Sequence, residues 1–214
     1  MSGTTNIEQN LEIDFFLRGQ AYAARANSFI GLLKCGKGVL ARSTAYILND
    51  TVAVLTSNGI LQLYKVTTAG TTAGSAPTYP GTVGEIIVDG SATLTEQSEL
   101  SLENASAIPE VSGGSYARVT YANTLANWAG TQGAGTTVAS TGTTGQTSNN
   151  NVVTFPQATA NWNTAPEKIW GFGIWDAVSA GNMIRHGGLT AAVDVLNTNT
   201  PSFAAGALII KIDR

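Results

Sequence analysis

Turn dipeptides divide this chain into short runs of β-type residues, and this spacing favours an all-β fold. Residues 52–55 and 60–66 flank Asn58-Gly59, and Asn-Gly accepts the positive φ angles of a tight hairpin turn. Asp89-Gly90 divides residues 83–94 in the same way. Short strands separated by turns indicate a β-sandwich or barrel. Further strands are predicted at residues 28–33, 116–121, 152–155, 169–175, 183–186 and 207–212.

A single helix is predicted at residues 5–17, near the start of the chain. Thr5 or Asn6 can cap its N-terminus, and Glu8 falls in the first turn, where the helix dipole favours an acid. Arg18-Gly19 ends the helix, because glycine adopts the left-handed conformation without strain. A helix this short is marginal alone, so its apolar side is expected to pack on another element: Ile7, Leu11 and Phe15.

Low charge limits the partners open to the chain. Charged residues make up 12% of the 214 residues, against about 25% in an average protein, and the formal net charge is −3. Because a phosphate backbone is bound by a surplus of Lys and Arg, no nucleic-acid partner is predicted. No apolar run approaches the roughly 18 residues that cross a bilayer, and residues 1–10 lack the apolar stretch of a secretory signal. Membrane insertion is therefore not expected.

The residues that carry most enzyme chemistry are scarce. His186 is the only histidine and Cys35 the only cysteine, which excludes two-histidine metal sites and cysteine-bound zinc. We predict that His186 lies at the surface or in a turn, at a strand end, and that Cys35 is a buried, inert thiol. Asp50 and Asp89 are predicted to close turns. No catalytic, metal-binding or cofactor-binding residue is predicted.

Two features leave alternatives open. Trp128 stands beside a polar loop and fits either a core position or a sugar-stacking surface. Trp170 fits a core position, on one strand face with Phe172 and Ile174. Residues 130–151 form a Gly, Thr, Ser and Asn tract, which is predicted to be a mobile loop or an arm ordered by a neighbouring subunit.

The segments outside residues 43–97 follow a pattern in a fixed order. After the opening helix, its main marks are Phe29-Ile-Gly-Leu-Leu33, Glu110-Val-Ser-Gly-Gly-Ser-Tyr-Ala-Arg118 and Ser202-Phe-Ala-Ala-Gly-Ala-Leu208. This pattern resembles a family of small tailed-phage proteins often labelled tail fibre or virion structural protein. The resemblance implies a β-sandwich or jelly-roll-like domain formed by residues 1–42 and 98–214.

Residues 43–97 carry a second pattern, which includes Ser43-Thr-Ala-Tyr46, Asn58-Gly59, Thr68-Ala-Gly-Thr71, Pro77-Thr-Tyr-Pro80 and Asp89-Gly-Ser-Ala-Thr-Leu94. It resembles a small β-hairpin module of phage structural proteins that is often compared with carbohydrate-binding domains. Where the module usually has tryptophan, this chain has Tyr79 and Leu94. The resemblance implies a module nested in the sandwich. The candidate glycan or partner contacts of the chain are Tyr46, Tyr64, Tyr79 and Trp128.

These observations predict a non-enzymatic structural protein of a tailed bacteriophage. The preferred hypothesis is a capsid decoration or cement protein, a homotrimer docked on the major capsid protein with the module facing outward. The alternative is a tail fibre or tail-tip protein that contacts other tail proteins and binds host surface glycans, where multivalency raises a weak single-site affinity. Under either hypothesis the protein is assembled in the host cytoplasm and acts in the virion without a cofactor.

Overall fold

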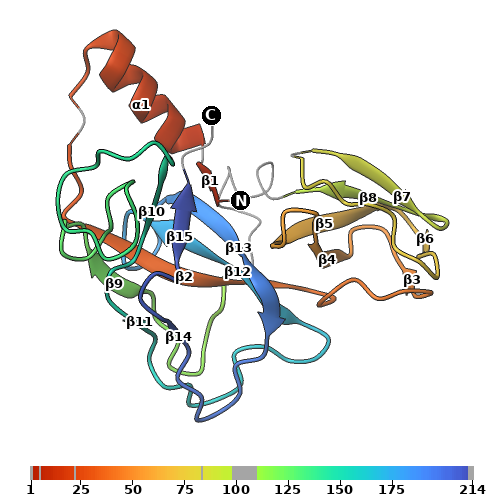
Figure 1. The fold of residues 1–214 in the computed structure, drawn as a ribbon. Coiled ribbons are helices and arrows are strands. Elements are labelled where there is room, and N and C mark those ends of the chain that lie inside the picture. Colours follow the sequence, from red (N-terminus) through yellow and green to blue (C-terminus); the bar gives the residue numbers. More distant parts are fainter. Residues whose placement is uncertain (1, 5, 22, 83, 98–109, 212–214) are drawn as a thin grey trace.

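The computed structural model describes residues 2–4, 6–21, 23–82, 84–97 and 110–211. These residues fold into antiparallel β-sheets with one short helix (Figure 1), which confirms the predicted all-β class. In chain order, the elements are β1 (Ser2–Thr4), α1 (Asn6–Arg18), β2 (Asn27–Cys35), β3 (Ala45–Tyr46), β4 (Thr51–Leu55), β5 (Leu61–Thr68), β6 (Gly70–Thr71), β7 (Ile86–Asp89), β8 (Ala92–Glu96), β9 (Val119–Ala122), β10 (Gln146–Ser148), β11 (Val153–Thr154), β12 (Lys168–Trp175), β13 (Met183–Val193), β14 (Ser202–Phe203) and β15 (Ile209–Lys211).

The largest sheet has five antiparallel strands in the order β1-β13-β12-β2-β9. Its three middle strands come from three of the predicted runs, although β13 continues to Val193, well past the predicted end at residue 186. β12 is buried along almost its whole length. A strand of this kind must be covered on both faces of its sheet.

One face of the central sheet is covered by the C-terminal half of the chain. The two-stranded ladders β10–β15 and β11–β14 lie over this face in Figure 1. The second layer is thus irregular, with short ladders and loops in place of a continuous sheet, and the arrangement is consistent with the predicted sandwich. The core between the layers includes Ile30, Leu32, Phe172 and Ile174 from the sheet and Val153, Phe155, Leu208 and Ile210 from the covering layer.

Residues 43–97 form the four-stranded sheet β4-β5-β8-β7 and the β3–β6 ladder. Both predicted hairpins are confirmed, because their flanking strands pair. Only the glycine of each dipeptide has a positive φ angle, +76° at Gly59 and +66° at Gly90, so the positive φ predicted for Asn58 is wrong. This block has a hydrophobic core of its own, built from Tyr46, Val52, Val54, Tyr64, Val66, Tyr79, Ala92 and Leu94. Its division from the rest of the chain as an inserted domain stays a prediction.

The other face of the central sheet packs on this block. A second core joins them, with Leu33, Cys35, Trp170, Trp175 and Met183 on one side and Ala53, Leu61 and Leu63 on the other. The two parts come very close at Gly188 of β13, where an added Cβ would lie 1.7 Å from the carbonyl oxygen of Leu61. Only glycine fits at this position while the two parts stay packed as observed.

Trp170 does not share a strand face with Phe172 and Ile174, so that part of the prediction is wrong. The pairing of β12 with both of its neighbours shifts between Ile169 and Gly171. Such a bulge adds a residue to one strand and reverses the alternation of its side chains. Trp170 therefore faces residues 43–97, whereas Phe172 and Ile174 face the C-terminal layer.

The helix α1 is found where it was predicted; of its expected apolar side, the Ile7 side chain lies outside the described residues, and the other two side chains are partly exposed. Leu11 and Phe15 are 38% and 46% exposed. Figure 1 shows α1 projecting from the sheets. An ion pair holds its first turn to the body, because Glu8 lies 2.8 Å from Arg25. Of the helical segments in the described ranges, none has the length and apolar character needed to span a bilayer.

Candidate functional site

Three of the four predicted contact residues lie inside the core of residues 43–97. Tyr46, Tyr64 and Tyr79 are at most 6% exposed. The Tyr79 hydroxyl donates to Asp89 Oδ2 at 2.6 Å, and the Tyr64 hydroxyl donates to Glu85. Burial raises the pKa of both Tyr64 and Tyr79. None of the three rings has a free face, so a sugar could stack on them only if this core opened.

Asp89 closes the Asp89-Gly90 turn as predicted, and it also anchors the surrounding loops. Its carboxylate accepts hydrogen bonds from the Tyr79 hydroxyl and from the backbone of Ala73 at 2.8 Å, and Arg42 lies 2.7 Å away. Burial alone would raise the pKa of Asp89, but these donors outweigh it and lower the pKa below its usual value. The Asp89 carboxylate therefore belongs to a structural ion pair with Arg42 and is not a free acid.

Trp128, the fourth predicted contact, is partly buried at the start of the polar tract. Its ring packs edge-on against Tyr121 with 5.1 Å between the centroids, and its Nε1 donates to Asn123 Oδ1 at 3.1 Å. These contacts hold the ring in one orientation while part of it stays accessible. Its role as a glycan or partner contact stays a prediction.

The tract at residues 130–151 is ordered by contacts within the chain itself. Thr136 Oγ1 donates to the carbonyl of Gly133 and Thr144 Oγ1 to that of Thr131, each at 2.7 Å, and Asn150 Nδ2 donates to the carbonyl of Thr136 at 3.0 Å. The end of the tract forms β10, which pairs with β15. Hydrogen bonds from side-chain hydroxyls and amides thus hold most of this tract in place, where a sheet would use backbone hydrogen bonds between strands.

The only histidine lies inside β13, so its predicted surface or turn position is wrong. His186 is 3% exposed and stands between Gly3 of β1 and Gly173 of β12. Among the described residues, its Nε2 has no hydrogen-bond partner. Burial lowers the pKa of His186 to about 3, which keeps the ring neutral. Cys35 is buried as predicted, and burial raises the pKa of its thiol to about 11.

The motif at residues 110–118 packs against the central sheet and is hydrogen-bonded to it. Arg118 donates two hydrogen bonds to Glu110, at 2.8 Å and 2.7 Å, and its guanidinium lies 4.0 Å from the centroid of the Trp175 ring. The Tyr116 hydroxyl donates to Glu110 at 2.8 Å and accepts from a backbone amide of β2 at 2.9 Å. The cluster fits against β2 because residue 31 is glycine. A Cβ added at Gly31 would lie 2.6 Å from the Tyr116 hydroxyl oxygen and would clash with it. The motif therefore has a structural role.

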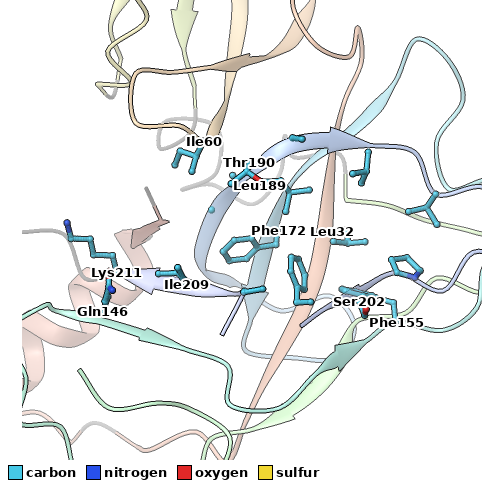
Figure 2. Close-up of a pocket in the computed structure, with 18 residues that line it drawn as sticks. Leu32, Ile60, Gln146, Phe155, Phe172, Leu189, Thr190, Ser202, Ile209 and Lys211 are labelled. Carbon is cyan, nitrogen blue, oxygen red and sulfur yellow. The ribbon is translucent and has the colours of Figure 1, made fainter. Parts of the chain in front are cut away.

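A groove of about 520 Å³ opens between β13 and the β14–β15 segment (Figure 2). Residues 187–193 of β13 form one wall, and Ile209 and Lys211 of β15 form the opposite side. Ile60, in the turn between β4 and β5, borders the groove from the block of residues 43–97. The floor consists of buried core residues: Leu32, Phe155 and Phe172.

The lining of this groove is apolar, with Lys211 as its one charged residue. β1 pairs with β13 only as far as Gly187, and beyond that point no described strand pairs with this edge of β13. Within the described part of the chain, no three His, Cys, Asp or Glu side chains gather as a metal site. The apolar lining of the groove is suited to docking an apolar surface.

Comparison with known families identifies the C-terminal half of the chain. The family model described as podophage GP4 fiber I protein gp80 matches residues 101–211, which is slightly more than half of the chain. The chain belongs to this family. Membership in the gp80 fibre family makes it a bacteriophage structural protein and a component of the virion. Among curated proteins, none matches the chain significantly.

The gp80 match covers most of the groove and leaves out residues 43–97. It includes the motif at residues 110–118 and every strand from β9 to β15. The resemblance of residues 43–97 to a carbohydrate-binding-like module stays a prediction, since the match begins at residue 101. Sequence reasoning missed the groove because its lining combines β2, β12 and β13 with the last two strands, and no local pattern links them.

Proposed function

We propose that this chain is a fibre component of a podophage virion. The observation that carries the proposal is the match of residues 101–211 to the gp80 fibre family. The family description favours the fibre hypothesis over capsid decoration, because it names a fibre. A body of packed β-layers with an apolar groove, and without clustered metal ligands in its described part, suits a protein that works by contact.

The proposed organisation is a sandwich of residues 1–42 and 98–214 with residues 43–97 inserted as a module. One observation supports it: residues 43–97 have a hydrophobic core of their own. We propose that the sandwich contacts other virion proteins and that the module is the part free to differ between fibres. Insertions are tolerated where they enter at an exposed loop and leave existing backbone bonds intact.

Localisation in the virion tests the fibre proposal. Asymmetric cryo-electron microscopy would compare wild-type virions with virions that lack this chain. The proposal predicts that density is lost from fibres, and that adsorption to the host falls while the capsid keeps its resistance to heat. Loss of density at repeated positions over the capsid shell, together with weaker capsids and unchanged adsorption, would refute it.

Among the four predicted contacts, Trp128 is the one at which we propose glycan binding, because its ring is partly accessible. Trp128→Ala tests this when it is compared with Val138→Ala, which changes an exposed side chain of the neighbouring tract. Weaker adsorption by the Trp128 variant alone, with an unchanged Tm, supports a glycan contact. Equal adsorption by both variants rules it out.

A further inference from the structure

Both walls of the groove are formed by strands that have an unpaired edge. β15 pairs with β10 along one edge, and no described strand pairs with its other edge. β13 pairs with β1 at residues 185–187, and its pairing with β12 passes directly from Gly188 to Val193. Residues 189–192 of β13 therefore have no partner strand on either side within the described chain, and none of them is fully buried. Open strand edges of this kind are the surfaces to which other strands add.

β1 shows which kind of element fits between these two walls. It is an extended strand that pairs with β13 in antiparallel register, with Ser2 opposite Gly187, and it also lies against β15. The groove starts at this end of β1, since Gly187 is one of its lining residues. A second extended segment in line with β1 would continue along residues 188–193 and would lie in the groove that Figure 2 shows.

The lining of the groove defines the chemistry of this second segment. Side chains of a strand alternate between its two faces, so one face of the segment would lie over the buried floor of Leu32, Phe155 and Phe172. The wall residues Val193 and Ile209 are 43% and 51% exposed beside this floor. Apolar side chains at every second position would cover floor and walls, while the other face would be polar and in water.

The open edge distinguishes a strand from other occupants of the groove. A helix satisfies its own backbone groups, and a compact apolar ligand has none to offer. Either could cover the apolar lining, but each would leave residues 189–192 without backbone partners from the occupant. Only an extended segment supplies both the apolar contacts and the backbone hydrogen bonds that this groove can accept.

The described part of the chain has no free extended segment that could fill the groove of a second copy. Each described strand already pairs with a neighbouring strand of its own chain. The polar tract at residues 130–151 is held by hydrogen bonds to its own loop and to the carbonyls beside it. These observations favour a different protein of the virion as the source of the segment.

We propose that the groove between β13 and β15 binds an extended arm of another virion protein, which adds as a strand to residues 188–193 of β13. The arm runs antiparallel to β13, in line with β1, and has apolar side chains at alternate positions. About six residues, or about 20 Å of strand, are enough to span this edge. The inference goes beyond the fibre proposal, because it requires only that the chain is a component of the virion.

A synthetic peptide of alternating valine and threonine tests the chemistry of the groove on the purified full chain. Fluorescence anisotropy measures its affinity, and hydrogen exchange measures the protection of the amides of residues 189–192. We expect the peptide to bind and to slow exchange of these amides at least tenfold. The same peptide with proline in place of each threonine lacks backbone donors and should bind at least tenfold more weakly. No binding, equal binding of both peptides, or binding without amide protection would overturn strand addition.

Variants of the two walls locate the binding surface. Val193→Glu and Ile209→Glu each place a charge against the apolar side of the peptide and should lower its affinity at least tenfold. Ile47→Glu is the matched control, because it also charges an exposed apolar residue but one that does not line the groove. Each variant is compared at an unchanged Tm, and if one wall variant unfolds, the other replaces it. Equal affinity of wall and control variants would refute binding in the groove.

A photo-crosslinking amino acid at the exposed position 190 identifies the occupant in intact virions. Mass spectrometry of the cross-linked peptides is expected to find one segment of another virion protein, with apolar residues at alternate positions. Cross-links only to this chain, within one copy or between copies, would overturn the proposal, and so would the absence of any cross-link. Location in the fibre is measured separately by cryo-electron microscopy, so the two proposals can fail independently.

Discussion

Lowering the pH from about 7 to about 4.5 is expected to destabilise the fold through His186. Burial lowers the pKa of this ring to about 3 in the folded state, whereas a histidine of an unfolded chain has a pKa of about 6.5. The unfolded state therefore binds the proton more tightly. The stability contributed by keeping the ring neutral is complete above about pH 6.5 and is lost as the pH falls toward 3.

The size of the effect follows from the gap between the two pKa values. A difference of one pKa unit corresponds to about 1.4 kcal/mol. At pH 4.5 the histidine of the unfolded chain is almost fully protonated, whereas the buried ring is still neutral. The free energy of unfolding should therefore fall by roughly 2–3 kcal/mol between pH 7 and pH 4.5 because of His186. The ring is 3% exposed, so solvent screening removes little of this amount.

Urea unfolding of the wild type and of His186→Gln, each at both pH values, isolates this contribution. Carboxylates titrate in both proteins and cancel in the comparison, so the wild type should lose roughly 2–3 kcal/mol more than the variant. Because His186 is the only histidine, its ring proton resonance can also be followed directly by NMR. Equal losses in the two proteins, or a ring that titrates near pH 6.5 in the folded state, would refute the burial argument.

Three further predictions concern buried positions. Gly188→Ala is expected to lower the Tm, because its Cβ would lie 1.7 Å from a backbone carbonyl; Gly74→Ala, with nothing nearer than 3.7 Å, should leave the same melt unchanged. Tyr79→Phe removes the donor to buried Asp89 and should cost about 1–3 kcal/mol in urea unfolding, and an unchanged midpoint would contradict the network. The Cys35 thiol, with its pKa raised to about 11, should react with a thiol reagent only as the protein unfolds; rapid labelling of folded protein at neutral pH would contradict its burial.

Features that depend on neighbouring residues were predictable from the sequence. Asn58-Gly59 and Asp89-Gly90 lie in the expected hairpins, since a glycine that accepts a positive φ angle marks a turn from its local sequence alone. The helix begins and ends within one residue of its predicted bounds. The long apolar runs of β2 and β12 were also found, because they must be strands in any sheet that buries both faces.

The burial of a side chain, and the sheet face on which it lies, could not be predicted from its neighbours in the sequence. The bulge in β12 turned Trp170 to the opposite face, and nothing within the strand's sequence marks a bulge that arises from pairing with two neighbours. His186 became a core residue because glycines of β1 and β12 stand on either side of it. Tyr64 and Tyr79 were expected at a contact surface, but loops that fold over the sheet cover their rings.

The sequence by itself determined the all-β class, the hairpins, the single helix and the shortage of groups for metal or enzyme chemistry, because each of these depends on residue type or on short-range spacing. Only the tertiary structure decided the candidate site. The groove joins residues from Leu32 to Lys211, and ion pairs hold Glu8 and Glu12 of α1 to arginines that are distant in the chain. Such surfaces depend on long-range packing, which no local pattern of residues encodes.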